Sequence, residues 1–192
     1  MLAKTELRQV LLLLAVGVMG LIAAGSAWAQ NSNSCAETDL PSPVIDLIKA
    51  KFPGWRPEQL SDLHSDDRQI WIKAHGNQCP GTAVGHFESP DRLSYAALLV
   101  PQSDPTGGCR LLVFSRMQSG DGYAWKLVVQ WNGKTYTAVV ISKAPPGHYS
   151  DYEHARISVT TRLDGVFLTF QEQGADLYYW SGGRYKTVRV SG

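Results

Sequence analysis

The stretch YAWKLVVQWNG, residues 123–133, decides the class of fold. Large apolar or aromatic side chains occupy every second position, at Tyr123, Trp125, Leu127, Val129 and Trp131. Alternation with a period of two is the pattern of a β-strand that packs one face against a core. The stretch therefore predicts a strand with Trp125 and Trp131 on its buried face.

Asn132-Gly133 directly follows this strand, and similar turn signals recur downstream. Asn-Gly favours a tight hairpin because both central residues of a type I′ turn need a positive φ. Asp164-Gly165 stands between ISVTTRL and VFLTF, and Ser181-Gly182-Gly183 stands between LYYW and RYKTVRV. Each of the three turns is predicted to join two antiparallel strands that are neighbours in the chain.

Further strand candidates lie near residues 68–74, 82–87, 95–100 and 109–116. With the hairpins they predict one antiparallel meander of about eight or nine strands. A single helix precedes them. Ser42-Pro43 supplies an N-cap and a first-turn proline, and Pro53-Gly54 ends the helix. Between them, Val44, Leu47 and Ile48 form an apolar side at helical spacing. We expect an α+β fold, mostly β, with one short N-terminal helix packed on the sheet.

Residues 1–29 are predicted to form a cleaved secretory signal peptide. Lys4 and Arg8 precede an apolar segment, and Ala27-Trp28-Ala29 places small residues at the cleavage positions. The alternative is an uncleaved anchor, because the uncharged segment 10–29 has about the length of a membrane-spanning helix. After cleavage we expect a disordered leader over 30–41 and a single β-rich domain over 42–192. The predicted location is secreted or periplasmic.

Charge excludes several classes of partner. The chain has a formal charge of +1, and loss of Lys4, Arg8 and Glu6 with the signal peptide would bring it to zero. Nucleic acids and anionic membranes are bound by clustered Lys and Arg. We therefore expect no nucleic-acid partner, and no membrane partner once the signal peptide is removed.

Three cysteines are present, Cys35, Cys79 and Cys109. In an oxidising compartment, these three cysteines can form at most one disulfide bond within a monomer. In a meander, Cys79 and Cys109 fall at the same end of the sheet, where the first strand enters and the third begins. We expect a Cys79–Cys109 disulfide, while a bond from Cys35 to either of them stays open as the alternative.

Residues 85–96, GHFESPDRLSYA, resemble the calcium-binding turn of FG-GAP or VCBS repeats, a family of secreted and surface proteins. The family pattern is Gly-Asp-Phe-Asn-Gly-Asp-Gly-x-x-Asp-Tyr-Ala, and this stretch matches it at Gly85, Phe87, Tyr95 and Ala96. The positions that bind calcium in the family hold His86, Glu88, Pro90 and Ser94 here. Asp91 stands where the family pattern has a glycine. Calcium needs six to eight oxygen ligands. We expect a degenerate loop that joins two strands and holds no metal.

The C-terminal segment LYYWSGGRYKTVRV is similar to the closing hairpin of many uncharacterised secreted bacterial proteins. Its consecutive aromatics Tyr178, Tyr179 and Trp180 point alternately to opposite faces of the strand. At least one of them is expected to face solvent unless both faces of the sheet are covered. We predict that these three residues form an exposed binding site for a partner protein or a glycan.

One cluster of titratable residues lies at His148-Tyr-Ser-Asp-Tyr-Glu-His154. His148, Asp151 and His154 can hold zinc or carry out acid–base catalysis, which makes a small metal-assisted hydrolase the alternative function. The simpler interpretation is a polar loop, because turn residues precede it and its spacing is irregular. Common enzyme signatures such as Gly-x-Ser-x-Gly and His-Glu-x-x-His are absent from the sequence.

The sequence thus favours a secreted or periplasmic, β-rich binding or interaction module that is not an enzyme and uses no cofactor. The expected partner is an envelope or extracellular protein. A glycan bound by the C-terminal aromatics is a further alternative.

Overall fold

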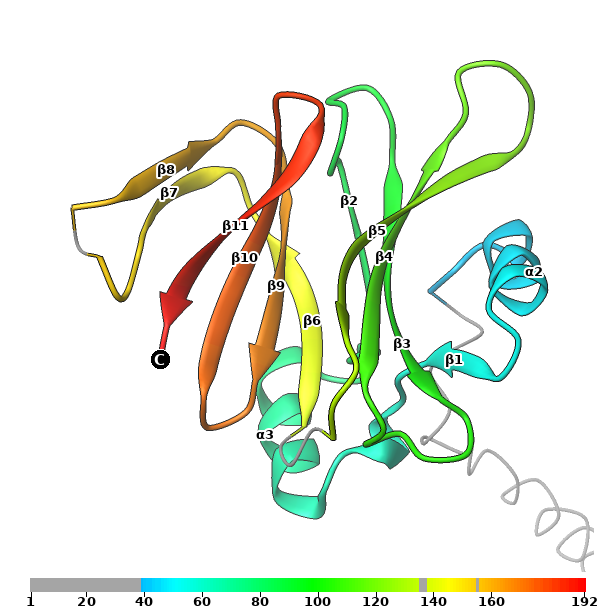
Figure 1. Cartoon of the computed structure of the whole chain (residues 1–192), viewed down its shortest axis with the longest axis horizontal. Coiled ribbons are helices and arrows are strands. Elements are labelled where there is room, and N and C mark those ends of the chain that lie inside the picture. The colour runs from blue at the N-terminus through cyan, green and yellow to red at the C-terminus, as the bar shows by residue number, and fades with distance from the viewer. Residues whose placement is uncertain (1–38, 135–137, 155) are drawn as a thin grey trace, which may run out of the picture. The chain divides into compact units, whose positions relative to one another are not determined.

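The computed structural model describes residues 39–134, 138–154 and 156–192. Strands dominate these residues, all sheet pairings are antiparallel, and two α-helices accompany them. The predicted α+β, mostly β class is therefore confirmed. The strands form two sheets that face each other across a shared core, with a separate two-stranded hairpin, so the prediction of one continuous meander is wrong (Figure 1).

The first sheet is built around β3. Its strands are β1 (Trp55–Pro57), β2 (Thr82–Gly85), β3 (Ser94–Pro101), β4 (Cys109–Arg116) and β5 (Tyr123–Trp131). β1 and β2 pair with successive parts of the same edge of β3, and β4 and β5 follow on its other side. β5 is therefore the last strand at its edge of the sheet.

The second sheet has the order β11-β10-β9-β6. Its strands are β6 (Val139–Ala144), β9 (Gly165–Phe170), β10 (Gly174–Ser181) and β11 (Arg184–Ser191). The separate hairpin consists of β7 (Gly147–Ser150) and β8 (Ser158–Thr161). Tyr149 and Val159 of this hairpin pack against Leu177 and Val188, so the hairpin covers one face of the second sheet.

Only one of the three predicted hairpin turns joins paired strands. Gly182 and Gly183 both have positive φ, and Ser181 pairs with Arg184 across the turn, as predicted. Asn132-Gly133 instead lies where the chain leaves the first sheet, because β5 pairs with β4 while β6 pairs with β9. Asp164-Gly165 likewise separates β8 from β9, which pair with other strands. These two hairpin predictions are wrong.

The predicted N-terminal helix is confirmed as α2 (Ser42–Lys51). Val44 and Ile48 of α2 pack with Leu99 and Leu112 on the outer face of the first sheet. Leu40, in the last part of the predicted leader, is buried in the same cluster. The signal peptide, the rest of the leader and Cys35 lie outside the described residues.

A helix, α3 (Ser65–His75), replaces the strand predicted near 68–74. Within α3, Ile70 and Ile72 are exposed and only Trp71 is buried. Acids occupy the first turn of α3 and bases the last, which complements the helix dipole, and Gly76 ends the helix with a positive φ. Trp71 packs with Leu60 of the short 3₁₀ turn η1 (Leu60–Asp62).

A β-bulge in β5 changes which side chains face the core. Leu111 pairs with Val129, yet the next residue, Leu112, pairs with Leu127, so Val128 is one residue extra. One inserted residue reverses the alternation beyond it. Trp125 consequently contacts Phe52 beside α2, on the outer face, while Trp131 contacts Phe170 of the second sheet. Their exposed fractions are 40% and 51%, so the prediction that both tryptophans are core residues is wrong.

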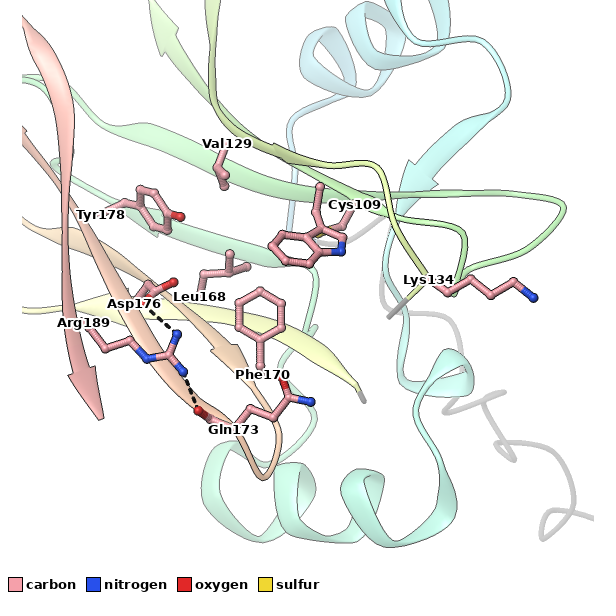
Figure 2. Close-up of a pocket in the computed structure, with 10 residues that line it drawn as sticks. Cys109, Val129, Lys134, Leu168, Phe170, Gln173, Asp176, Tyr178 and Arg189 are labelled. Carbon is pink, nitrogen blue, oxygen red and sulfur yellow. Dashed lines mark hydrogen bonds and ion pairs between the residues drawn. The ribbon is translucent and has the colours of Figure 1, made fainter. Parts of the chain in front are cut away.

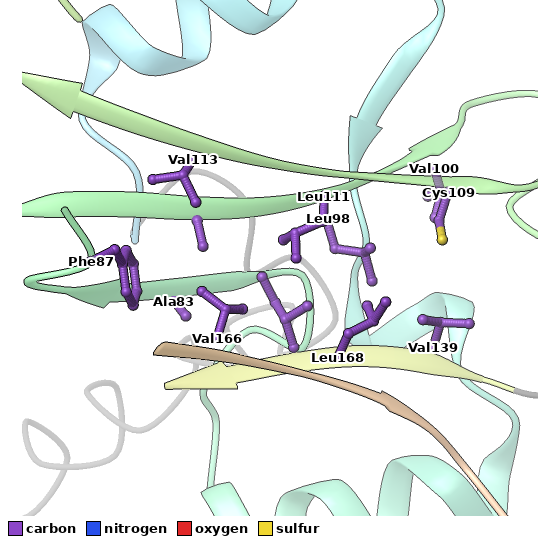
Figure 3. Close-up of a cluster of buried hydrophobic side chains, with 12 residues drawn as sticks. Ala83, Phe87, Leu98, Val100, Cys109, Leu111, Val113, Val139, Val166 and Leu168 are labelled. Atoms are coloured by element: carbon purple, nitrogen blue, oxygen red, sulfur yellow. The ribbon is translucent and has the colours of Figure 1, made fainter. Parts of the chain in front are cut away.

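The main core lies between the two sheets (Figure 3). Leu98 and Leu111 from the first sheet pack with Ile141 and Leu168 from the second. On one side the sheets nearly join, because the N–H of Ile141 donates a hydrogen bond to the carbonyl of Pro80, just before β2, at 2.8 Å. On the other side β5 and β11 pair with no further described strand, and the sheets part there.

Candidate binding cleft between the sheets

A cleft of about 410 Å³ opens between the two sheets on the side of β5 (Figure 2). Its lining comes from β4, β5, β9, β10, β11 and two adjoining turns, and comprises Cys109, Val129, Trp131, Lys134, Leu168, Phe170, Gln173, Asp176, Tyr178 and Arg189. This volume is within the usual range for sites that bind small molecules, about 300–1,000 Å³.

Aromatic side chains from both sheets form the walls. Trp131 and Phe170 meet edge to face, with their ring centroids 6.1 Å apart at 62°. Tyr178 of β10 lies across the cleft from Val129 (Figure 2). The bulge in β5 places Trp131 here, since it pairs with Cys109, whose side chain belongs to the core between the sheets. The cleft is thus lined by rings that can contact a planar ligand.

A pair of opposite charges lies on the wall formed by the second sheet. Arg189 Nη1 is 3.5 Å from Asp176 Oδ1. Arg189 also donates from Nε to the carbonyl of Ser191 at 3.0 Å, and from Nη2 to the carbonyl of Gln173. Burial raises the pKa of Asp176 above its ordinary value, which the charge of Arg189 partly offsets and that of Glu153 reinforces. The charge of Arg189 therefore does not fully offset the cost of burying the Asp176 carboxylate.

Cys109 forms part of the cleft floor and is a free, buried thiol. Cys79 is disulfide-bonded, but not to Cys109, so the predicted Cys79–Cys109 bond is wrong. Cys79 belongs to the cluster around Trp71, whereas Cys109 points into the core between the sheets. Burial, together with the charge of Glu58, raises the pKa of the Cys109 thiol to about 12. A neutral thiol is a poor nucleophile, so this residue is chemically quiet.

Glu88 lies in the loop between β2 and β3, and it makes an ion pair with β5 of the same sheet. Lys126 Nζ of β5 is 2.9 Å from Glu88 Oε2 and 5.0 Å from the centroid of the Trp180 ring on β10. Tyr185 of β11 packs edge to face on Trp180, and burial followed by the charge of Glu88 raises the pKa of Tyr185. We call Glu88, Lys126, Trp180 and Tyr185 the Glu88 cluster. It connects the two sheets on the same side as the cleft.

Other polar groups of residues 85–96 form hydrogen bonds within the protein. The N–H of His86 donates to Asp164 Oδ2 at 2.8 Å, and the hydroxyl groups of Ser94 and Ser115 are 2.9 Å apart. The N–H of Asp91 donates to Ser89 Oγ at 3.4 Å. Across the described part of the chain, His, Cys, Asp and Glu side chains form no group of three or more that can hold a metal ion.

The predicted aromatic site does not form an exposed surface, because both faces of β10 are covered. Tyr178 packs in the core between the sheets, and Tyr179 packs beneath the β7–β8 hairpin. Trp180 lies in the Glu88 cluster. All three residues are partly buried. Tyr178 alone lines the cleft.

The histidine cluster separates into two unrelated contacts. His148 Nδ1 on β7 is 3.2 Å from Thr160 Oγ1 on β8. His154 Nδ1 is 3.3 Å from Asp151 Oδ1, which also accepts a hydrogen bond from the N–H of His154 at 2.7 Å. The Asp151–His154 pair is therefore a turn contact, and His148 takes no part in it.

Sequence reasoning missed Asp176, Arg189 and Phe170, which line the cleft. One signal was available: Asp176, Tyr178 and Trp180 occupy alternate positions of one strand, so the acid shares a face with two inward-pointing aromatics. A carboxylate on the buried face of a strand is uncommon and marks a candidate site. No equivalent local signal indicates that β5 and β10 lie opposite each other.

Comparison of the chain with protein-family models, curated proteins and solved structures finds no match. No helix among the described residues is long and apolar enough to cross a membrane. The functional argument therefore depends on the geometry of the cleft.

Proposed function

We propose that the protein is a non-catalytic binding module that holds a small, partly aromatic ligand in the cleft between its two sheets. The observation that carries this proposal is the cleft itself, lined by Trp131, Phe170 and Tyr178 and containing the Asp176–Arg189 charge pair. Binding sites for small molecules combine apolar walls with a few polar groups that orient the ligand. This cleft has that composition.

Two properties of the site favour binding over catalysis. The thiol in the cleft is a poor nucleophile at neutral pH, since burial raises its pKa to about 12. The runner-up residues His148, Asp151 and His154 make separate local contacts and do not line the cleft. Export to a secreted or periplasmic location remains a prediction from the N-terminal sequence, and it suits a module that captures a solute outside the cytoplasm.

The proposal is tested with the neutral fluorophore N-phenylnaphthylamine, whose emission rises in an apolar site. We expect saturable binding to the unmodified protein and at least a ~10-fold weaker affinity after Trp131→Ala, because one aromatic wall is lost. Trp125→Ala is the matched control, since Trp125 lies on the same strand but faces α2. Equal effects of the two substitutions, or no saturable binding to the unmodified protein, would refute the cleft as the binding site.

A further inference from the structure

The Asp176–Arg189 pair is arranged so that both charges remain available to a ligand. Arg189 uses Nε and Nη2 on the carbonyls of Ser191 and Gln173, so the backbone fixes the guanidinium in place. Its contact with Asp176, at 3.5 Å, is long for an ion pair. None of the described residues donates a hydrogen bond to the Asp176 carboxylate. The side chains of Asp176 and Arg189 are 20% and 32% exposed, so a solute can reach both.

Such a pair discriminates between ligands by their charge. A purely cationic ligand that binds Asp176 is repelled by Arg189, and a purely anionic ligand that binds Arg189 is repelled by Asp176. A ligand that carries both charges a few bonds apart is attracted at both positions. Lys134, the remaining ionic group of the lining, extends away from the pair (Figure 2) and so does not change this balance.

The apolar part of the cleft specifies the rest of the ligand. Trp131 of the first sheet and Phe170 of the second present their rings to the cleft that Asp176 and Tyr178 also line. Aromatic rings pack edge to face or offset on one another at centroid separations of about 4.5–7 Å. A planar ring joined to a charged headgroup can therefore lie along the cleft with its head at the Asp176–Arg189 pair.

We infer that the ligand is a free aromatic amino acid. Its α-ammonium group donates to the carboxylate of Asp176, its α-carboxylate accepts from Arg189, and its ring packs against the surface formed by Trp131 and Phe170. This inference depends on the proposed function, because it assigns a ligand class to the same cleft. A zwitterion also suits a charge pair that is neutral as a whole, since neither protein charge is left unpaired in the complex.

The test is calorimetric titration of the unmodified protein with four compounds that share an indole ring. These are L-tryptophan, tryptamine, which lacks the carboxylate, indole-3-propionate, which lacks the ammonium, and indole itself. We expect L-tryptophan to bind at least ~10-fold more tightly than each of the other three, which corresponds to about 1.4 kcal/mol. L-Phenylalanine should also bind more tightly than L-leucine if the ring is recognised.

Asp176→Asn then identifies the group that binds the ammonium. We expect the Asp176→Asn variant to bind L-tryptophan no more tightly than the same variant binds indole-3-propionate. Asp121→Asn is the control, because that carboxylate is almost fully exposed and pairs with Arg116 outside the cleft.

Equal affinity for the four indoles, or a preference for a compound with a single charge, overturns the inference. Should N-phenylnaphthylamine still bind in a Trp131-dependent way, the proposed function survives that result. If neither the fluorophore nor any indole binds, both fail. The indole series uses unmodified protein, so the test stands even if Asp176→Asn does not fold.

Discussion

Glu58 shows how the fold acts on a single residue. Its side chain is buried, and its Oε2 atom has no hydrogen-bond partner among the described residues. The backbone of Glu58 leaves room only for glycine at position 81, because a Cβ there would lie 2.4 Å from the Glu58 carbonyl oxygen. Burial raises the pKa of Glu58 well above its ordinary value, reinforced by Asp62 and opposed by Arg56. The folded protein therefore favours the neutral form of this acid up to a higher pH than the unfolded chain does.

This pKa shift makes stability depend on pH in a defined direction. The folded pKa is higher than the unfolded one, so below the ordinary value near 4.5 both states are protonated and there is no penalty. As pH rises towards the folded pKa, the unfolded chain releases its proton first and the folded state loses relative stability. Replacing the acid with an amide of the same shape removes this loss.

We therefore expect Glu58→Gln to increase the free energy of unfolding relative to the unmodified protein by an amount that grows with pH. The gain in unfolding free energy from the substitution should be about 1–3 kcal/mol larger at pH 7 than at pH 4.5. Urea unfolding at several pH values measures it, with the exposed Asp121→Asn as control. A difference that stays constant between these pH values would mean that Glu58 is ionised in the folded state.

At the scale of elements, the Glu88 cluster joins β5 to β10 through Lys126. Glu88 has only 10% of its side chain exposed, and its second oxygen, Oε1, is buried without a partner. Removing Lys126 would leave the whole carboxylate without compensation, which costs more than removing both partners. Lys126→Met alone should thus be more harmful than Lys126→Met combined with Glu88→Gln.

A double-mutant cycle on these two substitutions measures the coupling, which we expect on the order of 1 kcal/mol. The exposed Arg116–Asp121 pair is the matched control and should show little coupling. Additive effects of the Glu88 and Lys126 substitutions would show that the ion pair between these two residues does not stabilise the protein.

The sequence identified β5 as a strand but not which of its side chains face the core. Alternation continues unbroken from Tyr123 to Trp131, so nothing local marks Val128 as the extra residue. The bulge depends on pairing with β4, which is a nonlocal contact. The helix α3 was missed for a related reason: Ile70 and Ile72 resemble one face of a strand, whereas the charges at the two ends of the segment favour a helix.

At the scale of the whole molecule, alternating strand patterns and the helix signals at Ser42-Pro43 were enough to predict a mostly β chain with an N-terminal helix. They did not predict how the strands are divided between sheets. The inner faces of both sheets carry the same kinds of aliphatic residues, such as Leu111 and Leu168. The sequence of one strand therefore does not indicate which other strand pairs with it. The cleft was therefore beyond sequence reasoning, because it requires β5 and β10 to lie on opposite sheets.

Division into two sheets also explains why the cleft lies where it does. The sheets are linked beside β2 and β6 by the hydrogen bond from Ile141 to Pro80. On the side of β5 the connection is made by side chains, namely the Glu88 cluster and the contact of Trp131 with Phe170. Side-chain contacts leave space that a backbone ladder would fill, and the cleft occupies that space.

The most direct measurement is a ¹H–¹⁵N correlation NMR titration with N-phenylnaphthylamine, since the five tryptophans among the described residues supply indole N–H reporters. We expect the signals of Trp131 and of the Gln173 side-chain amide to shift with a single saturable isotherm. The indole N–H of Trp71, which donates to the carbonyl of Gln78 at 2.7 Å beside α3, should stay unchanged. Shifts centred on Trp71 or Trp125, with Trp131 and Gln173 unmoved, would show that the cleft between the sheets is not the binding site.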